Sequence, residues 1–184
     1  GGMYVDQSNP ILRNVTINGN SAFGSPGMYI SSSNPILINV TISENIGIGK
    51  GGGMSVNYSN CVLTNVTITG NTSEIGGGIG TDNSNITLTN TIIWENIPNA
   101  IYSFTSNDDG IIITYSDIEG GWEGIGNIDA DPQFTDPVNG DFSLEEGSPG
   151  IDSGTADLDG DGYEDILGYC GTAPDMGAFE YITE

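Results

Sequence analysis

The chain has 184 residues, with 25 Asp and Glu, two Lys and Arg and no His, and its formal net charge is −23. Such a balance excludes nucleic acid and anionic membranes as partners, because both are bound through Lys and Arg. The absence of His excludes Ser-His-Asp and Cys-His catalysis and His-based metal sites. No apolar run reaches the ~18 residues that a membrane span needs.

The first part of the chain consists of a repeated unit. The stretch Asn-Val-Thr-Ile begins at Asn14, Asn39 and Asn65, and a degraded copy begins at Asn90, at steps of 25 and 26 residues. A fixed period of this size indicates a stacked repeat architecture. Each unit holds a glycine-led apolar alternation, a Ser-Asn turn, and two further short strands, with no helical period. We therefore predict an all-β fold, a parallel β-helix of about five rungs of 25–26 residues over residues 1–121.

Alternation along the strands assigns the two faces of the predicted coil, since successive side chains of a strand point to opposite sides. Met3, Val5, Leu12, Val15 and Ile17 should point inward together with their equivalents in later repeats. Tyr4, Thr16 and Asn18 should point outward. Equivalent side chains then stack at about 4.8 Å from rung to rung, so that each coil buries its face only between neighbours.

Two columns of Asn recur at the same period: Asn14, Asn39, Asn65 and Asn90 form one, and Asn20, Asn45, Asn71 and Asn96 form the other. We expect both to turn inward and to form ladders of side-chain amides, as in stacked β-structures. Asn also tolerates the left-handed backbone that a sharp corner demands. Several of these residues lie in Asn-x-Ser/Thr signals, but an amide held inside a ladder carries no glycan. Asn57 and Asn85, in turn regions, are the better candidates for N-glycosylation.

The Gly-Gly-Met-Tyr and Asn-Val-Thr-Ile-x-x-Asn units resemble those of right-handed parallel β-helix repeat proteins of bacterial cell surfaces. The resemblance covers about residues 1–120 and implies a right-handed coil. It carries less information on function, because pectin-degrading enzymes, adhesins and ice-binding proteins share such repeats.

After about residue 127 the repeat gives way to Asp129-Ala130-Asp131-Pro132, Gly147-Ser148-Pro149-Gly150-Ile151-Asp152 and Asp175-Met176-Gly177-Ala178-Phe179-Glu180-Tyr181. These segments resemble the C-terminal tail of secreted, surface-anchored bacterial β-helix proteins. A solenoid needs its last rung covered, because an open strand edge pairs with other extended chains. We therefore predict that residues 122–184 form an irregular C-terminal cap. Its apolar cover would come from Phe134, Phe142, Leu144, Ile151, Phe179 and Tyr181.

The segment 157–165 places acids at positions 1, 3, 5 and 9 of a loop, with Gly at position 6. This spacing follows an EF-hand-type loop, whose oxygen ligands suit Ca²⁺, and it resembles the loops of dockerins. The predicted ligands are Asp157, Asp159, Asp161, the backbone carbonyl of Tyr163, and Asp165. Gly168 stands where the full loop has a bidentate Glu, so another ligand must come from elsewhere or from water. Twenty of the 25 acids follow residue 104, and this acidic run is a solvated surface, a cation site, or both.

The first functional hypothesis is a non-enzymatic structural or adhesive module, secreted and located outside the cell or on its surface. The chain starts inside a rung, at Gly1-Gly2-Met3-Tyr4. Either it is a piece of a longer helix, or a bare rung favours end-to-end self-association into a filament. Cys61 and Cys170 would form one disulfide only if the fold brings them together.

The alternative is a protein that binds a surface polysaccharide. Tyr4 and Tyr29 should stack on adjacent rungs, and Trp94 should stand on the outer Thr face, so all three are candidate glycan contacts. Polysaccharide hydrolysis would need two carboxylates at a set separation, and the acids of the repeats occupy non-equivalent positions. Ice binding is a third reading, from outward Thr16, Thr41 and Thr67, but only one rung carries a Thr-x-Thr pair.

Overall fold

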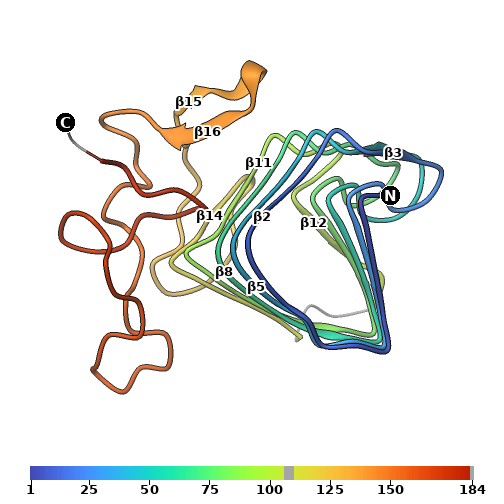
Figure 1. The fold of residues 1–184 in the computed structure, drawn as a ribbon, viewed down its shortest axis with the longest axis horizontal. Helices are drawn as coiled ribbons and strands as arrows, with labels where there is room; N and C mark the ends of the chain where they lie inside the picture. The colour runs from blue at the N-terminus through green and yellow to red at the C-terminus, as the bar shows by residue number, and fades with distance from the viewer. Residues whose placement is uncertain (106–109, 183–184) are drawn as a thin grey trace.

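A computed structural model describes residues 1–105 and 110–182, and it contains a coil of stacked parallel strands with an irregular C-terminal part beside it (Figure 1). The strands of the coil are β1 Met3–Asp6, β2 Ile11–Asn18, β3 Ser21–Ala22, β4 Met28–Ser31, β5 Ile36–Ser43, β6 Ile46–Gly47, β7 Met54–Asn57, β8 Asn60–Thr69, β9 Ile79–Asp82, β10 Asn85–Thr89, β11 Ile92–Trp94, β12 Ile101–Ser103, β13 Ile111–Thr114 and β14 Asp117–Ile118. The C-terminal part adds β15 Phe134–Asp136, the 3-10 helix η1 Pro137–Asn139 and β16 Asp141–Leu144.

The stacking follows the sequence period. One side of the coil is a five-stranded parallel sheet in the order β1-β4-β7-β9-β12. Its register pairs Met3 with Met28, Met28 with Met54, and Met54 with Ile79. The other large sheet runs from β2 through β5 and β8 to β10 and β11, and ends at β13 and β14. The prediction of an all-β parallel β-helix is therefore confirmed.

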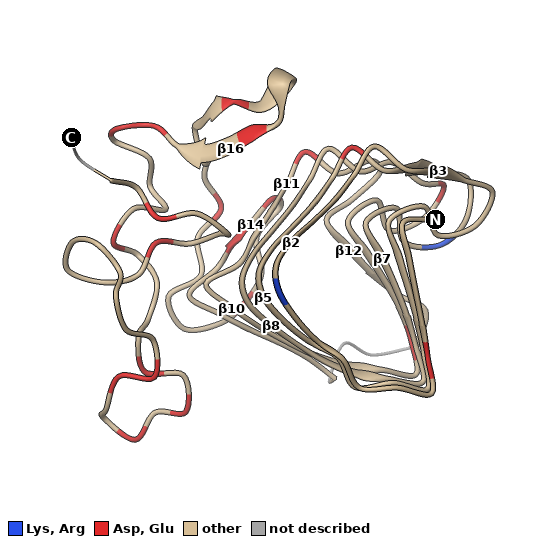
Figure 2. Cartoon of the chain, viewed as in Figure 1, with Lys and Arg blue, Asp and Glu red and all other residues tan. Residues whose placement is uncertain are grey.

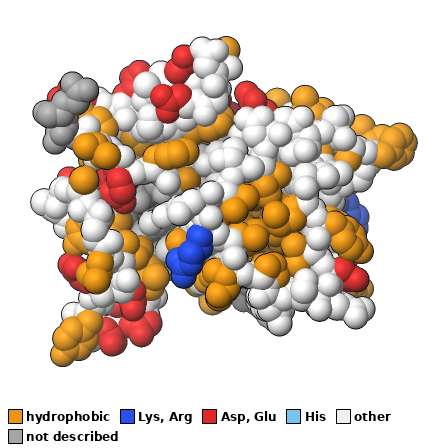
Figure 3. Space-filling model, in the orientation of Figure 1, with side chains coloured by type: hydrophobic (Ala, Val, Ile, Leu, Met, Phe, Trp, Pro, Cys, Tyr) orange, Lys and Arg blue, Asp and Glu red, His pale blue; other side chains and the backbone are white. Residues whose placement is uncertain are grey.

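The inside of the coil is a continuous apolar core built from the residues that alternation placed inward. Val5 and Ile17 in the first rung are almost fully buried, and their equivalents in the next two rungs, such as Ile30 and Ile42, are completely buried. Met3, Leu12 and Val15 are only partly buried, because no rung lies above them. Figure 3 accordingly shows hydrophobic side chains in the middle of the first coil.

The corner at Asn14 differs from the prediction in one respect. The second and third strands of each repeat are one bent strand in β2, β5 and β8, and the bend lies at an Asn with a left-handed backbone. The φ angles are 54° at Asn14, 53° at Asn39, 52° at Asn65 and 51° at Asn90. Asn14 and Asn39 are exposed and Asn90 bonds Thr155 outside the coil, so the prediction that this column turns inward is wrong. The predicted ladder forms in part, because Asn39 Nδ2 donates to Asn14 Oδ1 (3.3 Å) and Asn90 Nδ2 donates to Asn65 Oδ1 (3.0 Å). A left-handed residue breaks the alternation locally, so Asn14 points outward directly after the outward Arg13, and Val15 then points inward.

The second Asn column does lie inside the coil. Asn20 donates its Nδ2 to Asn45 Oδ1 (2.9 Å), Asn45 to Asn71 (2.9 Å), and Asn71 to Asn96 (3.0 Å). The backbone N–H of each residue donates to the same oxygen. This ladder leads into a third, short wall, in which β3 pairs with β6 and isolated bridges continue the stack. The sequence analysis did not anticipate this wall.

The far end of the coil is covered by a short segment directly after β14. Trp122 packs against the core, and the backbone of Ile128 pairs with β14 through two hydrogen bonds, to Ile118 and Ser116. The prediction that Phe134, Phe142, Leu144, Ile151, Phe179 and Tyr181 cover the last rung is wrong. Residues 134–182, here called the arm, lie beside the coil next to β14, β11 and β8 (Figure 1).

No helix within residues 1–105 and 110–182 is long and apolar enough to cross a membrane.

Candidate functional site

The arm docks on the outer face of the second large sheet. Its backbone amide at Ala178 donates to Thr67 Oγ1 (2.9 Å), and Gly177 donates to the carbonyl of Asn90 (2.8 Å). The Asn90 side chain in turn bonds both backbone groups of Thr155. Thr67 and Thr69, the Thr-x-Thr pair of the outer face, are almost fully buried. The arm itself is the partner of this face.

An apolar cluster anchors the arm. In the outward column that reads Thr16, Thr41 and Thr67, the fourth residue is Ile92. Ile92 forms a buried cluster with Leu144 and Met176 of the arm, and Trp94, Phe134 and Ile151 pack against it. The change from Thr to Ile in this column is the sequence signal that would have located the docking site.

Buried and half-buried carboxylates hold the arm in shape by accepting backbone N–H groups. Asp175 accepts from Asp152 (2.8 Å) and from Tyr181, and Glu180 accepts from Asp175 (3.2 Å). Burial raises the pKa of Asp175 and of Glu180. The backbone N–H groups of Ala173 and Thr172 lower the pKa of Asp152. The acidic residues of the tail pattern therefore stabilise the irregular backbone of the arm by accepting hydrogen bonds from its N–H groups.

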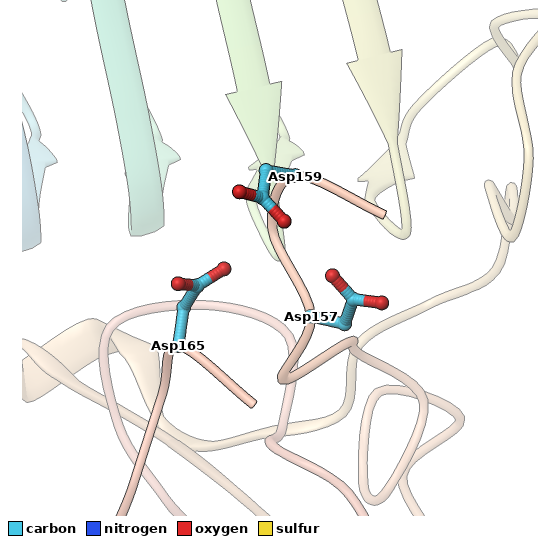
Figure 4. A group of neighbouring side chains, drawn as sticks. All are labelled: Asp157, Asp159 and Asp165. Atoms are coloured by element: carbon cyan, nitrogen blue, oxygen red, sulfur yellow. The ribbon is translucent and has the colours of Figure 1, made fainter. Parts of the chain in front are cut away.

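The loop 157–165 brings together three of the five predicted calcium ligands (Figure 4). Carboxylate oxygens of Asp157, Asp159 and Asp165 lie within 4.8 Å of one another. The Asp161 carboxylate lies outside this group and accepts the N–H of Tyr163 (2.9 Å). Asp157 accepts the N–H groups of Gly160 (2.7 Å) and Gly162 (2.9 Å), which fixes the turn. Three hard oxygen donors at this spacing fit a Ca²⁺ ion that completes its 6–8 ligands with carbonyls and water.

The stacked tyrosines are placed as predicted, on the outer face of β1 and β4. The ring centroids of Tyr4 and Tyr29 are 5.3 Å apart with an interplanar angle of 10°. Tyr4 is 70% exposed. Trp94, the third candidate glycan contact, is different: it is partly buried against the arm and not part of an open Thr face.

Three hollows of about 780, 350 and 310 Å³ are all lined by Glu95, and we call them together the Glu95 groove. The two smaller hollows lie between the coil and the hairpin of β15 and β16, whereas the largest is lined only by residues between 70 and 120. Glu44, Glu119, Asp131 and Glu145 line other parts of it. The sequence analysis missed this site, although Glu44 and Glu95 occupy the same corner two repeats apart. Figure 2 shows that acidic residues dominate this corner and the arm.

Asp117 is a second feature that the sequence analysis did not single out. It follows Ile92 in the outward column and is completely buried beneath residues 129–131. Its Oδ1 accepts the N–H of Ala130 (3.1 Å), while its Oδ2 has no hydrogen-bond partner within the described residues. Burial, reinforced by the nearby Asp129 and Asp131 carboxylates, raises the pKa of Asp117 to about 7.

This pKa predicts a pH-dependent stability. An acid with a raised pKa in the folded state binds its proton more tightly there, so its contribution to stability is full below the ordinary value near 4 and is lost as the pH rises to about 7. We expect Asp117→Asn to flatten the decline in unfolding free energy between these values. Urea titrations at several pH values test this, and Asp6→Asn, at an exposed acid of the first rung, is the control. An unchanged decline in Asp117→Asn would refute the assignment.

The remaining predicted sites are Asn57, Asn85 and the two cysteines. Asn85 is exposed and donates to Asn60 Oδ1 (2.6 Å), whereas Asn57 is half-buried and donates to Ser55 Oγ (3.2 Å). N-glycosylation of both stays a prediction. Cys61 is buried in the core, Cys170 is exposed in the arm, and both thiols are free. Burial raises the pKa of Cys61 to about 12.

A comparison with known protein families agrees with the β-helix fold. Residues 1–135 match the family described as "Right handed beta helix region", and the chain therefore belongs to this family. No curated protein and no solved structure gives a match. The family fixes the hand of the coil, and it does not by itself assign an activity.

Proposed function

We propose that the chain is a non-enzymatic, extracellular adhesive module that binds a surface polysaccharide. The observation that carries this proposal is the exposed Tyr4–Tyr29 stack on a rigid sheet face. Because the two rings are stacked, the open surface is the face of Tyr4 that points away from Tyr29, together with the edges of both rings. Such rings lose little conformational entropy on binding. The faces of sugar rings are the complementary surface.

A binding role also agrees with the rest of the molecule. A continuous core and an internal amide ladder make the coil stiff, and stiff elements hold a binding surface better than loops. The chain has no His and only two basic residues. Of these, Lys50 lies with its Nζ 3.7 Å from the ring centroid of Phe104, away from the tyrosine stack. A lyase-type base is therefore not offered beside this platform.

Glycan binding should depend on the stack. In an array of bacterial and plant polysaccharides, we expect the double variant Tyr4→Ala with Tyr29→Ala to lose about fivefold or more in affinity for any neutral glycan that the parent binds, since a ring contact contributes about 1 kcal/mol. Tyr58→Ala is the matched control, because Tyr58 is 67% exposed and belongs to no ring stack within the described residues. Equal loss in the control, or no loss in the double variant, would contradict the proposal.

A second part of the proposal concerns calcium. The acid spacing of residues 157–165 and the approach of Asp157, Asp159 and Asp165 support a Ca²⁺ site that orders the arm. Extracellular modules of this kind bind Ca²⁺ with dissociation constants of roughly 10⁻⁴ to 10⁻³ M. The ion would offset part of the negative charge of the arm, so binding and arm order are coupled.

Chelation should therefore loosen the arm. We expect EDTA to raise the rate of proteolysis within residues 150–180 and millimolar Ca²⁺ to restore resistance, because the ion binds only the ordered loop. Asp159→Asn should abolish the response. Glu146→Gln, an equal charge change at an exposed arm residue outside the loop, should retain it. If neither EDTA nor Ca²⁺ changes the rate of proteolysis of the parent protein, the proposed calcium site is wrong.

We do not extend the proposal to a head-to-tail filament. The strands β1 and β2 each pair on one side only, but the other end of the coil is covered by Trp122 and the residues around Ile128. A copy stacked head to tail would meet this cover instead of an open strand edge.

A further inference from the structure

Residues 128–131, here called the linker, connect the last rung of the coil to the arm. Ile128 pairs with β14 through two backbone hydrogen bonds of 2.9 and 3.0 Å. Directly after the linker, the carbonyl of the buried Pro132 accepts a hydrogen bond from Ser148 Oγ (2.6 Å) of the arm. The linker therefore fixes the point at which the arm leaves the coil, beside β14 (Figure 1).

Beyond Ile128, two carboxylates hold the linker to the coil. Asp117 Oδ1 of β14 accepts the N–H of Ala130 (3.1 Å). Asp129 Oδ1 of the linker accepts the N–H of Gly120 (3.1 Å). Because both acceptors are ionisable side chains, this attachment depends on pH.

The segment before the linker is held by an amide instead. Asn127 Oδ1 accepts the N–H of Ser116 (3.1 Å), and Asn127 Nδ2 donates to the carbonyls of Ile113 (2.9 Å) and Trp122 (3.2 Å). An amide side chain has no ionised form in this pH range, so these bonds are the same in acid and at neutral pH. The cover at Trp122 and the linker therefore differ in their response to pH.

Asp117 is hydrogen-bonded through one oxygen only. The residue is completely buried, and its Oδ2 has no partner within the described residues. The preceding residue of its column is Ile92, which belongs to the apolar cluster with Leu144 and Met176. An ionised Asp117 would therefore place charge on a buried oxygen that has no hydrogen bond, which costs free energy.

The charged groups around Asp117 oppose its ionisation further. The linker contributes Asp129 and Asp131, and both carboxylates disfavour another negative charge beside them. The next acid along the coil, Glu119, accepts the N–H of Glu95 (2.8 Å). Burial, together with Asp129 and Asp131, raises the pKa of Asp117 to about 7, so the carboxyl keeps its proton below this pH while the linker is attached.

Detachment of the linker changes the surroundings of this carboxyl. Water then reaches Asp117, and its pKa returns to the ordinary value near 4. The attached state therefore binds a proton that the detached state releases between these two values. Acid favours attachment, and a rise in pH toward 7 favours detachment.

We propose that Asp117 is a proton-controlled switch: its protonated carboxyl keeps the linker attached to β14, and loss of the proton detaches the linker and frees the root of the arm. Detachment uncovers the edge of β14, and an open strand edge can pair with an extended chain. The apolar cluster around Ile92 continues to hold the arm on the sheet. The change is local, and it is distinct from the pH dependence of global unfolding.

Hydrogen exchange of the full chain tests the switch. After division by the intrinsic rate at each pH, the opening constant at the Ala130 amide should rise about tenfold per pH unit from roughly 4 to 7 and then level off, because one proton is released. It should exceed the opening constant at the Ser116 amide, which donates to Asn127. A constant value at Ala130 would overturn the proposal, as would equal opening constants at the two amides.

Two variants assign the pH dependence to one residue. Asp117→Asn removes the ionisable group and keeps nearly the same shape, so the opening constant at Ala130 should no longer change with pH from roughly 4 to 7. Asp6→Asn, at an exposed acid of the first rung, should leave the dependence as it is in the parent protein. A dependence that persists in Asp117→Asn would give the control to another acid, such as Asp129, and would overturn the proposal.

Carbon-13 NMR of the Asp117 side chain in the parent protein is a check that needs no variant. The carboxyl should titrate well above the ordinary value near 4. A midpoint near 4 would overturn the proposal even if Asp117→Asn failed to fold. The result is separate from that of the proposed function, because Tyr4→Ala with Tyr29→Ala should leave the opening constant at Ala130 unchanged.

Discussion

Asn71→Ala is expected to lower the free energy of unfolding by about 4 kcal/mol, because it leaves several buried polar groups without partners. The side chain is completely buried. Its Nδ2 donates to Asn96 Oδ1, to the carbonyl of Ile42 (2.9 Å) and to that of Thr69 (3.1 Å). Its Oδ1 accepts both N–H donors of Asn45. Alanine removes all of these side-chain bonds.

A second Asn ladder, formed by Asn34, Asn60 and Asn85 at the surface, provides the control. Asn60 donates to Asn34 Oδ1 (3.0 Å) and accepts from Asn85 at the surface, where water replaces a lost partner. Asn60→Ala should therefore cost only about 0.5 kcal/mol. Urea unfolding followed by tryptophan fluorescence measures both variants. Similar costs at the two positions would mean that the internal ladder is not a principal support of the coil.

Met176→Ala should release the arm while the coil stays folded. Met176 is completely buried against Ile92 and Leu144, and truncation of such a side chain costs about 2–5 kcal/mol. The arm has few other apolar anchors on the sheet, so this loss falls on its local stability. Limited proteolysis should then cut within residues 145–180 and leave a resistant fragment that contains the coil.

Ile182→Ala is the comparison for this variant, because Ile182 is 72% exposed. Its proteolysis pattern should match that of the parent protein. If Met176→Ala is as resistant as the parent, the arm is held by something other than the apolar cluster. If the coil is lost together with the arm, the two form one cooperative unit.

The sequence predicts the coil well because the same pattern of apolar and polar residues recurs in each repeat. Alternation around Ile17, Ile42 and Ile68 defines the inward face, and the register of β2, β5 and β8 places these residues on one another. The column of Asn20 and its equivalents was also predictable, since buried amides need partners at the rung spacing. A single repeat would have given neither result.

The corner at Asn14 shows where alternation stops being a guide. One left-handed residue breaks the two-residue period. Strict alternation after the outward Arg13 would turn Asn14 inward, but Asn14 points outward as well. A column of serines, Ser8, Ser33 and Ser59, also connects the rungs, although the sequence indicates only a turn there. Ser33 Oγ accepts the N–H of Ser8 (3.1 Å), and the N–H of Ser33 donates to Ser59 Oγ (3.0 Å).

The position of the arm could not be read from the sequence, because the arm has no period and its contacts are distant in the chain. The bond from Ala178 to Thr67 spans 111 residues. Apolar residues such as Phe142 and Leu144 showed that the segment covers something, but not whether it covers the end or the side of the coil. The two hollows that Glu95 shares with the hairpin of β15 and β16 exist only because the arm folds back, so they were hidden for the same reason.

The central claim is that the arm lies on the outer face of the coil, over Thr67 and Asn90, and hydrogen exchange measured residue by residue tests it most directly. The amides of Gly177 and Ala178 should exchange slowly, because they donate to the Asn90 carbonyl and to Thr67 Oγ1. Thr67→Val should remove protection at Ala178, while Thr16→Val, in the exposed part of the same column, should not. Exchange of both amides at the unprotected rate in the parent protein, with the coil strands still protected, would contradict the claim.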